Sequence, residues 1–296
     1  MKLGFIGLGQ MGNPMCGRLM DAGHPLIVHD IRDDAVQPFA ERQARVVGTP
    51  MAVADEADVV FASLPTVAAY EEVALGRDGI REGSAAKVFV NLGTVGSDFI
   101  RHVAEEMEAA SIATIDCPIS GGPPGAAAGT LPIMASGPKE TFDKIEPYLT
   151  KMGTVTYAGE AVGLAQSLKL ANNILSATAL TATSEAIVMG VKAGLDPEIM
   201  LQAINIGSGR NSSTQDKFPR DVLTHDFAYG AALDILLKDV DLALAEGESL
   251  GVPMQVCQSV RQMLRLIRAE GGGEQDITRV AARVADWAGT EIPKTR

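Results

Sequence analysis

The sequence predicts an α/β protein in which a doubly wound sheet domain is followed by an all-helical domain. From residue 1 to about residue 158, short β-branched runs alternate with helical stretches, which is typical of a parallel sheet with crossover helices. After Gly163 the β-rich runs stop and apolar residues recur near the helical period. A chain of 296 residues is also long enough for two hydrophobic cores. We therefore expect a sheet domain over residues 1–160 and a helical domain over residues 161–296.

Seven strands are predicted in the sheet domain. Each is a short apolar or β-branched run, and Gly, Pro and Asp cluster between the runs as turns require. The predicted strands are Lys2–Ile6, Leu26–His29, Val59–Ser63, Val88–Asn91, Ala113–Asp116, Pro132–Ser136 and Val155–Tyr157.

A long helix leads out of the sheet domain. Leu164, Leu168, Leu175 and Ala179 recur near the helical period, and no proline interrupts the stretch up to Ala193. Long apolar helices in a domain without strands often pack against another subunit, so we expect a homodimer or homotetramer. Further helices are predicted at Asp196–Asn205, Leu233–Leu250, Met254–Glu270 and Ile277–Ala288.

Composition excludes several classes of protein. A formal net charge of −12 argues against nucleic-acid binding. We find neither an apolar run long enough to span a membrane nor a cleavable leader, and therefore expect a cytoplasmic protein without a membrane partner. The three cysteines are too few and scattered for a disulfide framework, so buried, reduced thiols are expected. The four histidines lack metal-ligand spacing, and no metal is expected.

The first predicted strand opens into a G-x-G-x-x-G motif that indicates a dinucleotide site. Gly7 permits a tight turn, Gly9 lets the backbone approach a pyrophosphate, and Gly12 lets the following helix pack closely. The helix N-terminus then faces the phosphates. We assign cofactor binding to the whole motif and predict a Rossmann-type domain; its six residues are Gly7, Leu8, Gly9, Gln10, Met11 and Gly12.

Asp30 stands eighteen residues beyond the motif, at the end of the second predicted strand. A carboxylate there can accept hydrogen bonds from the adenosine ribose and would repel the extra phosphate of NADP, which favours NAD. Arg32 lies two residues on and could reach that phosphate, so NADP stays open.

Three further strand ends are expected near the bound cofactor. Leu64 and Pro65 begin a sharp turn that suits a loop lying against the cofactor, and Thr94 offers a hydroxyl where the nicotinamide half would lie. The third segment, Asp116–Leu131, contains Ser120-Gly121-Gly122, whose hydroxyl and backbone N–H groups could hold a carboxylate. Plain strand-end turns and a flexible surface loop are the alternatives.

Two charged positions in helical stretches are candidate functional residues. Lys169 and Asn173 lie four residues apart, so both project from one helix face among apolar neighbours. Partial burial would lower the pKa of Lys169 towards the range of a general base. Lys238, followed by Asp239, is another charge within an apolar helix. A snorkelling surface lysine is the alternative at both positions.

Taken together, these segments resemble the β-hydroxyacid dehydrogenases, the group of 3-hydroxyisobutyrate dehydrogenase, tartronate semialdehyde reductase and L-threonate dehydrogenase. The resemblance covers nearly the whole chain and rests on four motifs in order: Gly4–Gly12, Asp116–Leu131, Gly163–Asn173 and Lys238-Asp239. It implies NAD(P)-dependent hydride transfer between a small β-hydroxy acid, similar to 3-hydroxyisobutyrate, and its semialdehyde or keto acid.

The resemblance also implies residue roles. It makes Lys169 the catalytic acid/base, and Thr94 and Lys238 cofactor contacts. Substrate would be bound by Ser120, Gly121, Gly122 and Asn173. Two positions depart from the family pattern. Ala165 replaces a usual glycine, and Gly93 stands where a serine commonly precedes the threonine, which could cost one hydrogen bond.

Other functions remain possible from the sequence. The alternatives are a non-catalytic NAD-binding regulator, an imine reductase and an enzyme similar to 6-phosphogluconate dehydrogenase. Imine reductases usually replace the lysine that is present here as Lys169, and 6-phosphogluconate dehydrogenase carries a histidine at the position of Asn172. Arg210 is a candidate partner for a second substrate carboxylate, with a surface role as its alternative. The sequence does not specify which hydroxy acid is used.

Overall fold

The computed structural model describes residues 1–295, which divide into two compact units with the division between Lys169 and Leu170. The sequence placed the boundary at residues 160/161. The division falls nine residues later, inside the long helix, because the first turns of that helix are hydrogen-bonded to the sheet unit.

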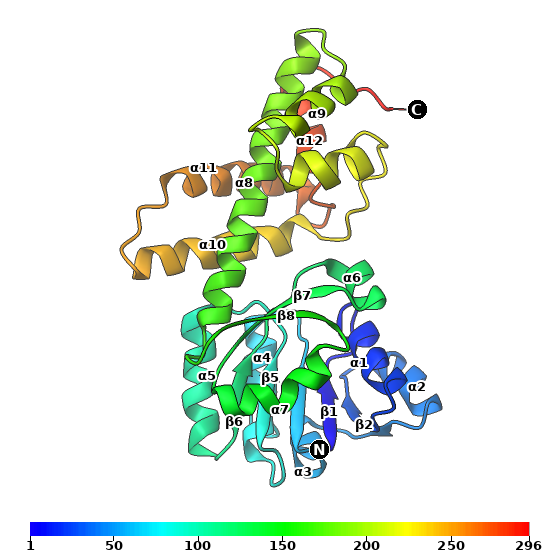
Figure 1. Cartoon of the computed structure of the whole chain (residues 1–296), viewed down its shortest axis with the longest axis vertical. Coiled ribbons are helices and arrows are strands. Elements are labelled where there is room, and N and C mark those ends of the chain that lie inside the picture. Colours follow the sequence, from blue (N-terminus) through cyan, green and yellow to red (C-terminus); the bar gives the residue numbers. More distant parts are fainter. Residues whose placement is uncertain (296) are drawn as a thin grey trace. The chain divides into compact units, whose positions relative to one another are not determined.

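The sheet unit contains one eight-stranded sheet with the order β3-β2-β1-β4-β5-β6-β7-β8 (Figure 1). Neighbouring strands are parallel except β6 and β7, which are antiparallel through the single pair Asp116 and Ser136. The prediction of a parallel sheet is therefore wrong for this pair. The strands are β1 (Leu3–Ile6), β2 (Leu26–His29), β3 (Arg45–Val46), β4 (Val59–Ala62), β5 (Val88–Asn91), β6 (Ala113–Asp116), β7 (Leu131–Ser136) and β8 (Gly153–Gly159).

Helices cover both faces of this sheet because its central strands bury side chains in both directions. In β1, Leu3 and Phe5 face one hydrophobic core and Ile6 faces the other. The first core also contains residues of α1 (Gly12–Asp21), α2 (Asp33–Glu41), α6 (Gly122–Ala128) and α7 (Lys139–Leu149). The second contains residues of α3 (Pro50–Glu56), α4 (Val67–Leu75), the 3₁₀ turn η1 (Ile80–Glu82) and α5 (Ser97–Ala109).

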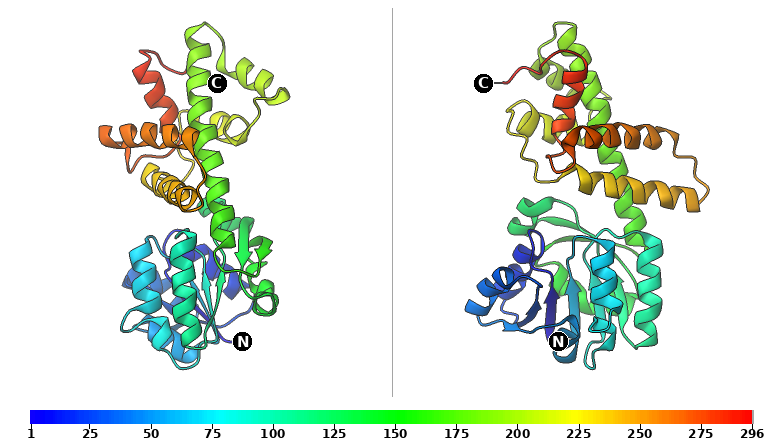
Figure 2. Two further views of the ribbon diagram at one scale, coloured as in Figure 1. Left: turned by 90° about the vertical axis from the view of Figure 1, so that its left-hand side faces the viewer. Right: turned by 180° about the vertical axis from the view of Figure 1, so that it is seen from behind.

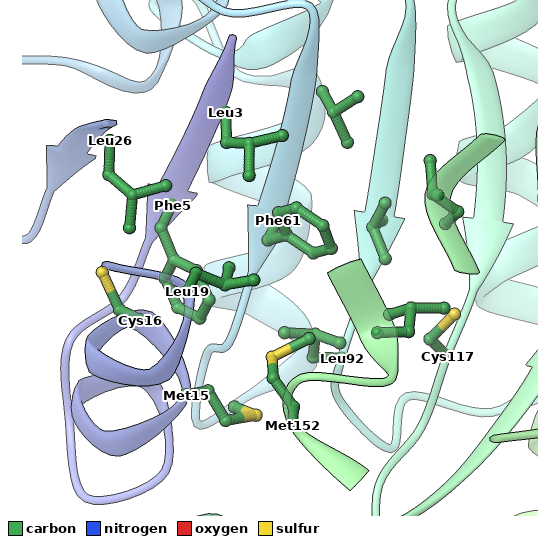
Figure 3. Packing of buried hydrophobic residues seen from close by; sticks show 14 of the residues in the cluster. Leu3, Phe5, Met15, Cys16, Leu19, Leu26, Phe61, Leu92, Cys117 and Met152 are labelled. Carbon is green, nitrogen blue, oxygen red and sulfur yellow. The ribbon is translucent and has the colours of Figure 1, made fainter. Parts of the chain in front are cut away.

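Aromatic, aliphatic and sulfur-containing side chains pack together in the first core (Figure 3). Phe5 and Phe61 stack with ring centroids 6.1 Å apart. Cys16 and Cys117 are buried here, and burial raises the pKa of both thiols. All three cysteines are free, as expected, although Cys257 of the helical unit is only half-buried.

The second unit is helical and is organised around the long helix α8 (Leu164–Lys192), with α10 (Leu233–Ser249) and α11 (Gln255–Ile267) running side by side (Figure 2). Asp196 caps the next helix by accepting hydrogen bonds from two backbone N–H groups. The sequence did not predict the wide π-helical turn η2, because its residues are mostly polar and Pro219 lies inside it. The elements are α9 (Pro197–Ile206), η2 (Ser213–Val222), α10 (Leu233–Ser249), α11 (Gln255–Ile267), η3 (Arg268–Gly272) and α12 (Arg279–Trp287).

The hydropathy of α8 corrects one expectation. Its most apolar window has a mean hydropathy of 1.5, so this helix is long and apolar enough to cross a membrane by length and composition. The prediction that no apolar run is long enough to span a membrane is therefore wrong. Half of the window is buried inside the protein, as in the core helices of many globular domains.

Candidate active site

Several predicted site segments meet at one edge of the sheet. The strands β1, β4, β5 and β6 are parallel, so their carboxyl ends lie along the same edge. Backbone hydrogen bonds continue just past these strand ends. The Ser63 N–H, after β4, donates to the carbonyl of Ile6 in β1, and the Leu92 N–H, after β5, donates to the carbonyl of Ala62 in β4. The chain order reverses between β1 and β4, and ligands of such sheets bind at this switch point.

The glycine loop after β1 has the shape of a pyrophosphate cradle. Gly7 has a φ of 86°, and a Cβ there would overlap the Ser63 carbonyl oxygen. A Cβ at Gly12 would overlap the Gly7 carbonyl oxygen, so α1 packs directly on the loop. A Cβ at Gly9 would meet nothing within 4 Å. Two glycines thus build the loop while the third keeps space open, which fits a dinucleotide phosphate.

Asp30 fixes this loop from the end of β2. Its carboxylate accepts hydrogen bonds from the backbone N–H groups of Leu8, at 2.6 Å, and Arg32, at 2.9 Å. The Arg32 Nε lies 3.6 Å from the same carboxylate on a side chain that is 54% exposed. Asp30 therefore has a loop-shaping role that the sequence did not indicate. Within the rest of the motif, Leu8 is buried, Met11 half-buried and Gln10 exposed.

The turn that begins with Leu64 and Pro65 is tied through Tyr70 to the end of β4, the strand that precedes it. The Tyr70 hydroxyl donates to the Ala62 carbonyl at 2.9 Å and accepts from the Leu64 N–H at 3.1 Å. A Cβ at Gly93 would overlap this hydroxyl and ring. Gly93, noted above as a departure from the family pattern, thus provides the space that the tyrosine fills.

A fully buried polar network lies behind the loop that carries Thr94. The Asp116 carboxylate accepts hydrogen bonds from the Asn91 amide at 2.8 Å and from the Gln166 amide at 2.7 Å. Its other oxygen accepts from the Gln166 backbone N–H at 3.2 Å. All three residues are buried completely. Hydrogen bonds to a buried charge contribute about 1.5–3 kcal/mol each, so the network holds its parts firmly.

Gln166 uses the remaining atoms of its amide to clamp the Thr94 loop. Its carbonyl oxygen accepts from the backbone N–H groups of Val95 and Gly96, and its NH₂ group also donates to the Gly93 carbonyl. Ala165, the other departure from the family pattern, is fully buried, and its N–H donates to the Ser136 hydroxyl at 3.0 Å. The first turn of α8 is thereby locked to β6, β7 and the loop after β5.

Lys169 follows Gln166 by three residues and is itself buried, with 6% of its surface exposed. A lysine that is nearly out of contact with water is unusual and is held here by a rigid first turn. The surface-lysine alternative does not hold for this position.

The predicted carboxylate loop begins after β6. Ser120 is half-buried, and its N–H is bonded to the Pro132 carbonyl at 2.9 Å. Gly121 and Gly122 both have positive φ and stand at the start of α6, so their N–H groups precede the hydrogen-bond ladder of that helix. The role of this segment as a carboxylate site stays a prediction.

In the helical unit, Asn173 and Lys238 both contact Asp239. The Asn173 amide donates to Asp239 Oδ2 at 2.6 Å, and Lys238 Nζ lies 2.9 Å from Oδ1. Asp239 is 5% exposed. This carboxylate orients both neighbours. Arg210, in contrast, is exposed in the loop between α9 and η2.

The sequence did not identify Gln166, Tyr70 or the clamp on Asp116 as parts of the site. A glutamine at the start of an apolar helix was the only signal for the first, and it does not indicate a partner. Among residues 1–295, no group of three or more His, Cys, Asp or Glu side chains could hold a metal ion.

Both halves of the chain match known protein families. Residues 2–159 match the NAD-binding domain of 6-phosphogluconate dehydrogenase, and residues 163–284 match the NAD-binding domain of NADP-dependent 3-hydroxyisobutyrate dehydrogenase. The 2-(hydroxymethyl)glutarate dehydrogenase of Eubacterium barkeri is 34% identical over 95% of this chain and 93% of its own. The mitochondrial 3-hydroxyisobutyrate dehydrogenase of Mus musculus is 32% identical over 94% and 85%.

A solved structure agrees with these matches. The 3-hydroxyisobutyrate dehydrogenase of Mycobacterium tuberculosis with L-serine has a TM-score of 0.88 at 26% identity, over 96% of this chain and 98% of the other.

The glycine loop yields one prediction. Gly9→Ala should fold normally but weaken NADH binding at least about tenfold, because its methyl group enters only the space left for the phosphates. Gly12→Ala should lower the melting temperature by about 5 °C or more, because its methyl group overlaps backbone. Thermal melts and NADH fluorescence titrations measure both effects. An equal loss of stability in the two variants would contradict the assignment of Gly9.

The clamp made by Gln166 yields a second prediction. Gln166→Met keeps the volume of the side chain but removes one of the donors to Asp116 and leaves the backbone N–H groups of Val95 and Gly96 without partners, at about 1–3 kcal/mol each. We expect a marked fall in melting temperature. The exposed Gln37→Met serves as the matched control and should melt like the wild type. A Gln166→Met protein as stable as this control would show that the clamp contributes little.

Proposed function

We propose that this chain, which belongs to the β-hydroxyacid dehydrogenase family, interconverts a small β-hydroxy acid and its semialdehyde or keto acid with Lys169 as general acid/base. Family membership rests on two family models that together cover most of the chain and on relatives that match it over 94–95% of its length. The protein is an NAD(P)-dependent hydroxyacid dehydrogenase. The identity of the hydroxy acid and the roles of individual residues are the proposed parts.

The observation that carries the proposal is a buried lysine on a clamped helix turn. Lys169 is 6% exposed, and Gln166, one turn earlier, is bonded to both Asp116 and the loop of Thr94. When bound, the nicotinamide of the cofactor accepts or supplies the hydride. The Lys169 amine takes the substrate hydroxyl proton during oxidation, and its ammonium form returns a proton during reduction.

Asn173 orients the reacting oxygen. One N–H of its amide is held by Asp239 and its carbonyl oxygen accepts from Asn172, so its second N–H remains to donate to a ligand. One helical turn separates it from Lys169, which places both side chains on the same face of α8. Lys238, paired with Asp239, is proposed to contact the cofactor.

The Ser120–Gly122 segment is proposed to bind the substrate carboxylate. Its hydroxyl and two backbone N–H groups are suitable donors, and holding the carboxylate fixes the direction in which the carbinol carbon points. The relatives are named for hydroxy acids with one carboxylate, as in 3-hydroxyisobutyrate, and with two, as in 2-(hydroxymethyl)glutarate. We propose substrates from this range.

NAD is the proposed preference between the two cofactors. The Asp30 carboxylate stands at the end of β2, where it would repel the 2′-phosphate of NADP. Gly7–Gly12 would hold the pyrophosphate, while Leu64, Pro65 and Thr94 would line the nicotinamide half.

Self-association through the helical unit is also proposed. Large apolar side chains remain exposed there, among them Leu175 and Met189 on α8 and Ile206 at the end of α9. Their burial in a homodimer or homotetramer would be favourable. Cytoplasmic localisation and the lack of metal, membrane and nucleic-acid partners stay predictions.

The acid/base role can be tested with Lys169→Met. We expect kcat to fall about 10²- to 10⁴-fold, which is the usual contribution of a general acid/base, while the Kd for NADH stays within about twofold. The exposed Lys144→Met on α7 is the control. Absorbance at the NADH band, with a panel of C3 to C5 hydroxy acids, measures turnover. A Lys169→Met enzyme with wild-type kcat would refute the role.

The cofactor preference can be tested by steady-state kinetics with NAD and NADP. We expect kcat/KM for NAD to exceed that for NADP by about tenfold or more, since the ribose-binding carboxylate discriminates against the phosphate. Asp30→Ser should reduce this ratio. Arg32→Ala should leave the NAD kinetics unchanged; a preference of the wild type for NADP that Arg32→Ala abolishes would overturn the proposal.

A further inference from the structure

Lys217 is a buried cation in the helical unit that the proposed mechanism does not use. It lies in η2 with 2% of its surface exposed. Its Nζ donates to the Ser176 hydroxyl at 3.2 Å and lies 5.0 Å from the centre of the Tyr229 ring. Burial lowers the pKa of its ammonium group.

No carboxylate pairs with this ammonium. Among residues 1–295, no Asp or Glu oxygen lies within 4.0 Å of Lys217 Nζ. The two acids nearest in sequence, Asp216 and Asp221, are instead paired with Arg220 at 3.0 Å and 2.9 Å. The charges of Asp216 and Asp221 still favour the ammonium form from a longer distance, while Arg220 opposes it. Buried charges in proteins are normally paired directly, so a lysine whose direct contacts are a hydroxyl and a ring is suited to an anion from outside.

Ser176 is the more exposed member of the pair that it forms with Lys217. Elsewhere on α8, Thr178, Thr181 and Ser184 each donate to the carbonyl one turn back. Within the described residues, the half-buried Ser176 has no such bond and accepts from Lys217 instead. Its own proton therefore remains to donate to a ligand, and the neighbouring ammonium makes it a stronger donor.

Ser176 shares a helix face with the proposed reacting groups. Lys169, Asn173 and Ser176 follow one another on α8 at spacings of four and three residues, which form one stripe. At 1.5 Å of rise per residue, Ser176 lies about 10 Å along the axis from Lys169. A substrate whose hydroxyl meets Lys169 can therefore extend along the stripe towards Ser176.

We propose that Ser176 and Lys217 form an anion subsite for a second carboxylate, which makes β-hydroxy dicarboxylic acids the substrate class of this protein. The inference rests on the proposed function, since it places the rest of the substrate at Lys169. Ser176 donates to the distal carboxylate directly, and Lys217 neutralises its charge from the buried side. Arg210, considered above for this role, is exposed and lies outside this stripe.

The test compares two substrates, 2-(hydroxymethyl)glutarate and 3-hydroxyisobutyrate, across three variants. Lys217→Met should lower the ratio of kcat/KM for the dicarboxylate to that for the monocarboxylate by about tenfold or more, because the charge that neutralises the distal carboxylate is lost. Ser176→Ala, which suits a helix, should lower the same ratio about threefold or more and covers the case in which Lys217→Met does not fold. Arg210→Met is the matched control and should keep the wild-type ratio.

Two results would overturn the subsite. One is an equal loss for both substrates in Lys217→Met and Ser176→Ala, which indicates a merely structural lysine. The other is a fall in the ratio caused by Arg210→Met alone. If the wild type turns over neither substrate, the proposed function fails separately, and calorimetric titration with glutarate then decides. Weaker glutarate binding in Lys217→Met supports the subsite, and equal or absent binding refutes it.

Discussion

The buried carboxylate of Asp116 is the constraint on which the rest of the site depends. A charge with no exposed surface must be satisfied inside the protein, and here Asn91 and Gln166 both donate to it. Because Gln166 donates through its backbone as well as its side chain, the carboxylate fixes where α8 begins. The helical period then determines the position of Lys169, so one satisfied charge places the amine that we propose as the acid/base.

At the cofactor edge of the sheet, one carboxylate also has two roles. Asp30, which we propose accepts hydrogen bonds from the adenosine ribose, also holds the glycine loop by accepting a hydrogen bond from the Leu8 N–H. Gly7 and Gly12 make that loop possible by leaving no side chain between it and its neighbours. The loop shape and the proposed cofactor preference therefore depend on one carboxylate, and we expect changes at Asp30 to act on both.

Much of the fold could be predicted because its signals are local. Seven strands and the long helix follow from short apolar runs and the helical period, and the glycine motif lies next to its strand. Contacts between distant segments could not be predicted. The antiparallel pairing of Asp116 with Ser136, the clamp made by Gln166 and the position of Lys217 all depend on which segments meet. In η2, polar residues and Pro219 hide the helix itself.

Tyr70 and Gly93 constrain each other. The tyrosine hydroxyl bridges Ala62 and Leu64 only because residue 93 has no side chain. Any larger residue at position 93 would displace the ring, and any smaller residue at position 70 would leave a void beside the glycine. The side chains allowed at the two positions therefore depend on each other, and a serine at position 93 requires the tyrosine ring to move or to be replaced by a smaller side chain.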